Sequence, residues 1–223
     1  GTNWRAILGT KTGRCRVMSI WRTRMILPLM AIAVVVISLA PQTHANPDLS
    51  IAQATTSAKM PRVRADFPVP ADKAQLFYVQ RSMNSNTVVY AAQFDGQGML
   101  KSRAPVRAYW RRFNTTSEVK SLKWFEDAFA YGVKARRTQD STYKVRFQAI
   151  PDLAVELRQT APFQAALWAQ VEDRELRLNY AYLDLDESGM IPRVTALRLF
   201  GTDPTSGLAH AYIITVSGGD FRK

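Results

Sequence analysis

The chain has 223 residues, 47% of them hydrophobic and 22% charged, with one cysteine, two histidines and a formal net charge of +12. This is the composition of a globular protein, and it excludes a disulfide framework and the zinc sites that need several cysteines or histidines. Half of the net charge lies in the first 45 residues, which hold six basic residues and no acidic one. The rest of the chain is only moderately basic, so we expect a solvated basic surface and no nucleic-acid partner.

The beginning of the chain predicts an upstream segment that is not part of the folded protein. Residue 1 is a glycine, and Met18 and Met25 are the candidate initiators. We therefore expect residues 1–17 to be non-native or mis-annotated upstream sequence. The only cysteine, Cys15, lies in this segment.

Residues 18–45 have the organisation of a secretory signal peptide. A basic start is followed by the apolar run Met25–Ala40 and then by the small residues Thr43 and Ala45 at positions −3 and −1, which predicts cleavage between Ala45 and Asn46. The alternative is a membrane anchor, but the run is shorter than the roughly 18 apolar residues that span a bilayer. We expect a periplasmic or secreted protein that meets the membrane only through this peptide, before cleavage.

Three further regions follow the predicted cleavage site. Residues 46–66 are rich in Ala, Thr, Ser and Pro without apolar periodicity, which predicts a disordered spacer. Residues 67–217 read as a single β-rich domain, and residues 218–223 as a tail. The domain is long enough to bury one core.

Apolar and polar residues alternate along most of the domain. The clearest run is Tyr143 to Ala149, in which Tyr143, Val145 and Phe147 share one face. Alternation of this kind is typical of antiparallel strands with one buried and one solvated face. With the turn residues between the runs, it predicts a mainly β fold: an antiparallel barrel, half-open barrel or sandwich of about nine strands, with one amphipathic helix.

The helix is predicted after a capping-box pattern. Thr115 and Glu118 have the T-x-x-E spacing, and Gly132 can end the helix. Apolar residues recur between them at helical spacing, namely Val119, Leu122, Phe125, Ala128 and Phe129. We expect this helix to close a barrel mouth or to cover a sheet edge.

The sequence carries no signature of catalysis or of a cofactor. His210 lies in phase with the apolar residues of a strand, so we expect a structural histidine. The residues Asp184, Asp186 and Ser188 match the first half of a calcium loop, but Thr195 stands where the closing glutamate belongs. An acidic hairpin turn is the preferred interpretation, and weak calcium binding remains the alternative.

Two clusters of polar and aromatic residues are candidates for ligand binding. Arg81 with Asn84 and Asn86 combines a planar donor fork with amide donors and acceptors. Tyr109 and Arg111 share a strand face, opposite to that of Trp110. In both clusters the alternative is a purely structural role. Asn residues often shape the turn of a hairpin, and aromatic residues on strands often pack against their neighbours without contacting a ligand.

Several short motifs, in order along the chain, resemble the bacterial domain-of-unknown-function family 4833. They are Leu76-Phe77-Tyr78-Val79-Gln80-Arg81, Asn84, Asn86-Thr87-Val88-Val89-Tyr90, Pro105-Val106, Tyr109-Trp110, Tyr131-Gly132-Val133 and Gly201-Thr202-Asp203-Pro204-Thr205-Ser206-Gly207. The resemblance covers residues 67–217 and implies an exported bacterial domain, without assigning an activity to any residue. Tyr131, in one of these motifs, completes the candidate ligand-binding residues.

The leading hypothesis for function is a non-catalytic module that binds a small molecule or an envelope component, without a cofactor. One alternative is a hydrolase that uses two of the carboxylates Asp184, Asp186 and Asp203, which would have to lie within about 5–10 Å of each other. The other is a structural or interaction protein of the cell envelope, which predicts an exposed apolar patch.

Overall fold

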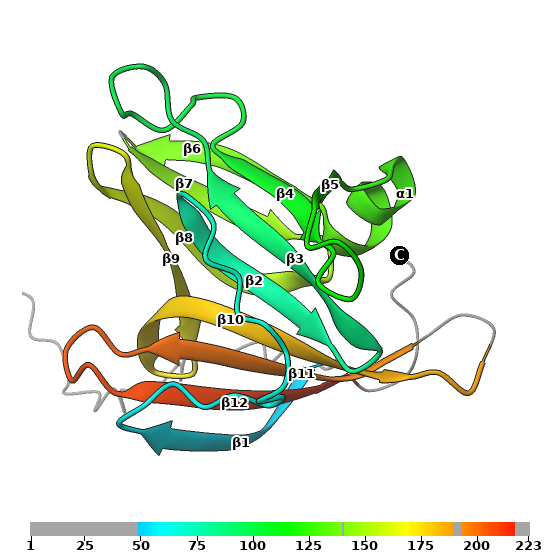
Figure 1. The fold of residues 1–223 in the computed structure, drawn as a ribbon. Helices are drawn as coiled ribbons and strands as arrows, with labels where there is room; N and C mark the ends of the chain where they lie inside the picture. The colour runs from blue at the N-terminus through cyan, green and yellow to red at the C-terminus, as the bar shows by residue number, and fades with distance from the viewer. Residues whose placement is uncertain (1–48, 140, 190–192, 217–223) are drawn as a thin grey trace, which may run out of the picture. The chain divides into compact units, whose positions relative to one another are not determined.

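The computed structural model describes residues 49–139, 141–189 and 193–216 (Figure 1). The predicted upstream segment 1–17, the signal peptide 18–45 and the tail 218–223 lie outside the described residues. No helix in the described part of the chain is long and apolar enough to cross a bilayer.

The described residues form a mainly β domain with one short helical segment. The strands are β1 (Leu49–Ser57), β2 (Gln75–Arg81), β3 (Asn84–Ala92), β4 (Val106–Arg111), β5 (Val119–Ser121), β6 (Val133–Gln139), β7 (Thr142–Phe147), β8 (Ile150–Ala161), β9 (Gln164–Val171), β10 (Arg174–Asp186), β11 (Arg193–Thr202) and β12 (Ala209–Val216). The helical segment consists of α1 (Trp124–Glu126) and the π-helical turn η1 (Asp127–Tyr131). The sheet curls into a half-barrel, which confirms the predicted fold class.

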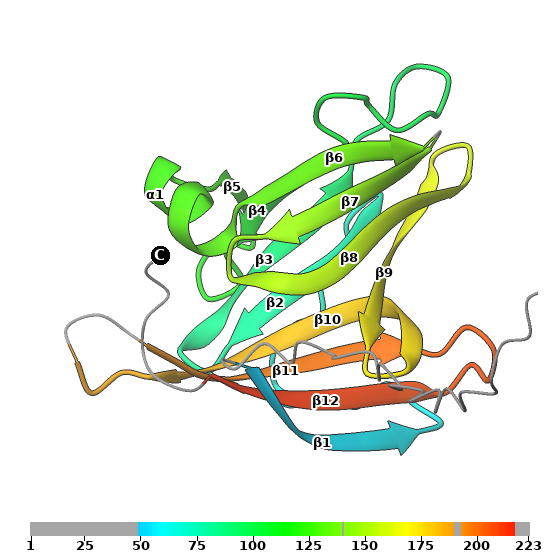
Figure 2. The same cartoon turned by 180° about the vertical axis from the view of Figure 1, so that it is seen from behind.

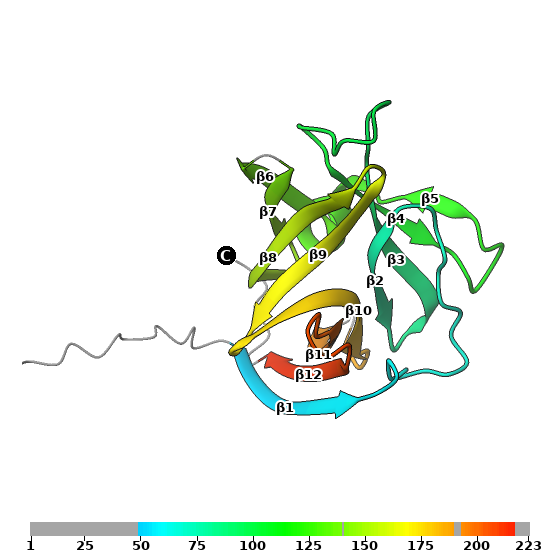
Figure 3. The ribbon, with the colours of Figure 1, turned by 90° about the vertical axis from the view of Figure 1, so that its left-hand side faces the viewer.

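The sheet curls around β10, because this strand changes partner along its length. Its first residues, Arg174–Arg177, pair with β9, whereas Tyr180–Leu183 pair with β2. One wing of the sheet continues from β9 through β8 and β7 to β6, and the other from β2 through β3 and β4 to β5. Figure 2 shows strands β6 to β9 side by side, and Figure 3 shows the two wings rising from β10. On its other edge β10 pairs with β11, which leads to β12 and β1.

The pairing of β2 with β10 is parallel, which departs from the purely antiparallel sheet that the sequence predicted. All other strand pairs among the described residues are antiparallel. Side-chain alternation shows which face of a strand is buried, but it is the same for parallel and antiparallel neighbours. The long chain between β2 and β10 allows this crossover.

The inner faces of the two wings enclose the main core. In β7 the predicted alternation is found, with Tyr143, Val145 and Phe147 buried and Lys144 and Arg146 exposed. Phe147 lies in the centre, with its ring 5.6 Å from that of Phe77 and 4.9 Å from that of Tyr90. Fully buried leucines from β8, β9 and β10 complete the core.

A second aromatic cluster lies on the outer face of β2, β10 and β11. Tyr180 stacks between Tyr78 and Phe200, at ring distances of 5.0 and 4.2 Å. Residues 58–74, which we call the clasp, cross this face and cover the rings. The clasp is held by hydrogen bonds to the sheet: the Tyr180 hydroxyl donates to the Pro61 carbonyl (2.6 Å), and the Gln80 amide donates to that of Pro68 (3.0 Å).

The expectation of a disordered spacer over 46–66 does not hold for the described residues of that range. Residues 49–57 form β1, which pairs with β12, and the following residues belong to the clasp. Composition misled here because these residues are ordered by the sheet surface that they cover and by the free edge of β12, neither of which a local pattern reveals. Proline is also suited to the clasp, since it donates no backbone hydrogen bond.

The predicted helix is shorter than expected and begins later. Val119–Ser121 form β5 beside β4, so Thr115 and Glu118 do not cap a helix. The hydrogen bond that caps α1 joins the Lys123 N–H to the Glu126 carboxylate (2.7 Å). A β-branched residue such as Val119 suits a strand, and an open edge of β4 was available to pair with it.

Replacing Phe67 tests the clasp. Phe67 is only 6% exposed and packs on the outer cluster, so we expect Phe67→Ala to lower the free energy of unfolding by about 3 kcal/mol. Urea unfolding measures this. Val69→Ala is the control, because Val69 is 48% exposed, and it should change stability by less than about 0.5 kcal/mol. A loss in Phe67→Ala as small as the one expected for the control would show that the packing of Phe67 contributes no stability.

The outer cluster also predicts a loss of stability at alkaline pH. Burial raises the pKa of Tyr78 from 10 to about 12, against the opposing charge of Arg62. Because the folded state binds this proton more tightly, the stabilisation is complete below pH 10 and is lost as the pH rises towards 12. Unfolding free energies measured across this range should fall, and less steeply in Tyr78→Phe. An unchanged slope in that variant contradicts the assignment.

Candidate functional site

Four of the predicted ligand-binding residues meet at one mouth of the half-barrel. Arg81 ends β2, Asn84 begins β3, and Tyr131 ends η1. The Arg81 guanidinium donates to the Tyr131 hydroxyl (3.3 Å) and to the Asn84 amide oxygen (3.2 Å). The amide oxygen of Asn86 accepts from the Asn114 N–H (3.2 Å), at the same end of the sheet. The first predicted cluster and Tyr131 are thus brought together.

Aromatic rings position the Arg81 guanidinium. Its central carbon lies 4.6 Å from the centre of the Trp110 ring, and the Trp110 and Tyr131 rings are edge-to-face at 5.1 Å. The Trp110 indole N–H donates to the Glu126 carboxylate (3.1 Å). A planar cation stacked on an aromatic face and held by hydrogen bonds is fixed in orientation.

A small polar hollow of about 230 Å³ opens beside this cluster. The lining residues are Arg81, Asn86, Trp110, Arg112, Lys120, Ser121, Lys123 and Glu126. The hydrogen bonds of Arg81, however, join β2 to η1 and β3, so its observed contacts are those of a structural brace.

Tyr109 and Arg111 lie on the other side of the sheet and take no part in this mouth. Arg111 forms an ion pair with Asp72 of the clasp, with its Nε 2.9 Å from the carboxylate. Tyr109 is buried beneath the clasp, and burial, together with the Asp72 charge, raises its pKa to about 12. Both residues therefore serve in packing the clasp onto β4.

The candidate carboxylates do not meet as a group. The Asp184 carboxylate is paired with Arg198 (2.8 Å), and that of Asp186 accepts the Ser188 N–H (2.9 Å) in a turn. Asp203 follows the other end of β11, since Thr202 pairs with Arg177 and Asp184 lies seven residues further along β10. At about 3.3 Å per residue this separation is on the order of 20 Å, too long for a hydrolase pair of Asp203 with Asp184 or Asp186. Asp184 and Asp186 are close along β10, but they are engaged by Arg198 and by the turn, respectively.

The described residues contain no group of three or more His, Cys, Asp or Glu side chains placed to hold a metal ion. Asp184 and Asp186 of the half calcium loop are engaged as above. His210 is buried, and its Nδ1 lies 3.1 Å from the Thr56 hydroxyl. Its Nε2 has no hydrogen-bond partner among the described residues, so the expected structural histidine is satisfied at only one nitrogen.

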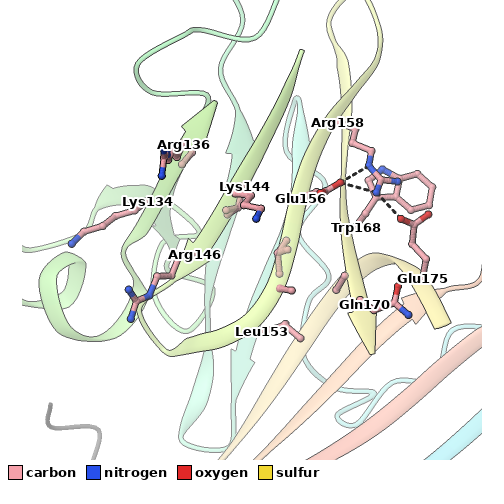
Figure 4. A pocket seen from close by; sticks show the side chains of 15 residues that line it. Lys134, Arg136, Lys144, Arg146, Leu153, Glu156, Arg158, Trp168, Gln170 and Glu175 are labelled. Carbon is pink, nitrogen blue, oxygen red and sulfur yellow. Dashed lines mark hydrogen bonds and ion pairs between the residues drawn. The ribbon is translucent and has the colours of Figure 1, made fainter. Parts of the chain in front are cut away.

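A larger groove of about 530 Å³ runs over the outer face of the β6–β9 wing (Figure 4). One side of the groove carries Lys134 and Arg136 from β6, and Lys144 and Arg146 from β7. We call these four residues the basic array. Lys134 stands directly opposite Arg146, and Arg136 directly opposite Lys144. None of the four forms an ion pair with another described residue.

The other side of the groove has a different character. Arg158 pairs with both Glu156 (2.7 Å) and Glu175 (2.6 Å), and its guanidinium lies 5.3 Å from the centre of the Trp168 ring (Figure 4). The Trp168 indole N–H is buried and has no acceptor among the described residues. Gln170 lines the groove beside it. The groove thus joins a strongly basic side to a polar and aromatic one.

The basic array was missed as a site in the sequence, although the signal was present. Lys134 and Arg136, like Lys144 and Arg146, are two residues apart and share one strand face. Such spacing is also typical of an ordinary solvated face, which is the interpretation that we preferred. Only the register shows that the two pairs oppose each other.

The chain matches the model of a known protein family. The family model described as Domain of unknown function (DUF4833) matches residues 77–210. No curated protein and no solved structure matches the chain.

The brace formed by Arg81 can be tested without a ligand. Arg81→Lys keeps the charge but removes the planar fork, so we expect a loss of about 1–2 kcal/mol of stability and faster amide exchange around Tyr131. Hydrogen exchange and urea unfolding provide the two readouts. The control is Arg112→Lys, whose partner Glu118 is exposed and whose ion pair is long at 3.4 Å. If exchange at Tyr131 is the same in both variants, Arg81 is not the brace.

Proposed function

The chain belongs to the DUF4833 family, whose description assigns no activity, and we propose that the domain is a non-catalytic module that binds an acidic ligand of the cell envelope. The groove over β6–β9 is the binding site. The proposal includes the export and the processing predicted from the first 45 residues, because an envelope ligand requires that compartment.

The observation that carries this proposal is the basic array. Like charges directly opposite each other on a sheet lie about 5 Å apart and destabilise it. Here two such pairs are adjacent. Glu156 of β8 stands opposite Lys144, but its carboxylate is paired with Arg158, and the described residues supply no carboxylate within ion-pair distance of the array. A site that lowers stability in this way is expected where the charges serve binding.

The spacing of the array favours an extended acidic ligand. The two pairs are two residues apart along the strands, about 6.5–7 Å, and the strands are about 4.8 Å apart. Carboxylate or phosphate groups repeated along a polar chain match such spacings, and lysine and arginine bind both groups. Gln170 and the Trp168 indole offer neutral contacts to the rest of the ligand.

The groove supports binding better than catalysis. Its lining carboxylates are Glu156 and Glu175, and both are paired with Arg158. Because the Arg158 guanidinium holds both carboxylates, neither is free to contact a substrate in the groove. The side chains that line the groove come from neighbouring strands of the β6–β9 wing, so it crosses several strands, which suits the recognition of a chain (Figure 4).

Removing one opposed pair tests the proposal. Arg136→Gln/Lys144→Gln should weaken the binding of hexagalacturonate or tripolyphosphate about tenfold or more, because two charged contacts are lost. Isothermal titration calorimetry at low salt measures this, with neutral maltohexaose as a ligand that should not bind. The same variant should unfold at an equal or higher urea concentration, since the repulsion is relieved.

The matched control for this experiment is Lys101→Gln/Arg103→Gln, which removes the same charge from an exposed loop. This control should change the affinities for hexagalacturonate and for tripolyphosphate by less than about twofold, since distant surface charges are screened by salt. Equal weakening in the two variants would mean that only net charge matters. Absence of binding to both acidic probes contradicts the proposal.

A further inference from the structure

The short helical segment carries a group of exposed aromatic side chains. Trp124, Phe125 and Phe129 are 77%, 45% and 73% exposed. Their rings are neighbours, with Trp124 5.9 Å from Phe125 and 6.4 Å from Phe129. We call these three residues the aromatic knob. A single exposed aromatic residue is ordinary, but a contiguous group marks an interaction site.

The knob is held in place by the half-barrel. The Glu126 carboxylate accepts from the Trp110 indole, the Tyr131 carbonyl accepts from the Tyr90 hydroxyl (2.8 Å), and the Ala128 carbonyl accepts from the Gln148 amide (2.8 Å). These bonds fix one side of the segment to the sheet.

Gly132 fixes the end of the same segment. A Cβ at this position would lie 1.8 Å from the Asp127 carbonyl oxygen, so only glycine allows the turn to close against β6. The aromatic side chains therefore point away from the sheet because the backbone is anchored, and this explains why the apolar face predicted for the helix is not buried.

The charges around the knob are mainly positive. Lys120 and Lys123 precede it, and the Lys123 amine lies 5.6 Å from the centre of the Phe125 ring. Lys134 and Arg146 follow at the adjacent end of β6 and β7. Of the acidic groups nearby, Glu118 pairs with Arg112, and Glu126 binds the Trp110 indole. Asp127 is the other acidic residue of the helical segment.

We propose that the aromatic knob inserts into the headgroup region of a membrane that contains anionic phospholipids. Tryptophan favours the membrane–water boundary, where phenylalanine can also be buried, and flanking lysines are attracted to anionic headgroups. The exposed aromatic surface is on the order of 400 Å², about half of what each partner buries in a stable protein interface.

This contact is independent of the groove and of the ligand proposed for it. It also goes beyond the membrane contact expected from the sequence, which was limited to the signal peptide. A domain bound in this way would remain at the membrane surface after the signal peptide has been removed.

Trp124 provides a local readout in the full chain. The chain has five tryptophans, so the fluorescence of Trp124 is obtained as the difference between the natural protein and Trp124→Phe. With vesicles of phosphatidylethanolamine and phosphatidylglycerol we expect this difference spectrum to shift to the blue and to be quenched by lipids with brominated acyl chains. With phosphatidylcholine vesicles the quenching should be much weaker.

Two variants separate the knob from other membrane contacts of the chain. Phe125→Ser/Phe129→Ser should abolish the quenching of Trp124, and Lys120→Gln/Lys123→Gln should raise the lipid concentration needed for half-maximal quenching by roughly tenfold. Phe163→Ser, which removes an exposed aromatic residue (56%) from the β8–β9 turn, should leave the quenching of Trp124 unchanged. The groove variant Arg136→Gln/Lys144→Gln should also leave this quenching unchanged.

The proposal is overturned if Trp124 stays accessible to aqueous acrylamide and unquenched by brominated lipids when vesicles are present. It is also overturned if Trp124 is already shielded from acrylamide without vesicles, since a second copy or another part of the chain then covers the knob. If the groove variant loses ligand binding but retains the quenching of Trp124, the membrane contact does not depend on the groove.

Discussion

The change of partner along β10 is the constraint on which the rest of this structure depends. Because Arg174–Arg177 pair with β9 and Tyr180–Leu183 with β2, one strand belongs to both wings and the sheet cannot remain flat. The curl gives the domain an inside, filled by Phe77, Tyr90 and Phe147 and by the leucines of β8 to β10. It also gives an outer face to each wing, one covered by the clasp and the other carrying the groove.

The two outer faces show how differently a sheet surface can be used. On the outer face of β2, β10 and β11, aromatic residues such as Tyr78 and Tyr180 would expose apolar surface to water. The clasp covers them with prolines and Phe67, and the Asp72–Arg111 ion pair holds it to β4. On the outer face of the β6–β9 wing the exposed positions are mostly charged or polar, so they need no apolar cover. An uncovered, charged face is where a soluble ligand can bind without displacing part of the protein.

Much of this arrangement could be predicted from the sequence. Period-two alternation identified the buried face of β7 and the core position of Trp110, and Arg81, Asn84, Asn86 and Tyr131 do meet in space. What failed depended on distant partners. Residues 49–66 are ordered by β12 and by the outer aromatic cluster, and Val119 by the edge of β4. The basic array depends on register, which alternation within a single strand does not define.

The aromatic knob and the basic array are unfavourable features of the isolated domain, in opposite ways. The knob leaves apolar surface in water, and the array brings like charges together. Serine in place of the knob's phenylalanines would reduce the exposed apolar surface, and glutamine in place of the array's cations would reduce the charge repulsion, in both cases without disturbing the core. The end of β6 and β7 that carries Lys134 and Arg146 lies beside η1, so the two features are neighbours. An anionic membrane compensates the knob, because it takes up apolar side chains, whereas the acidic ligand proposed for the groove compensates the array. The groove extends from that end across the sheet, so an acidic ligand bound along it would approach the membrane surface at Lys134 and Arg146.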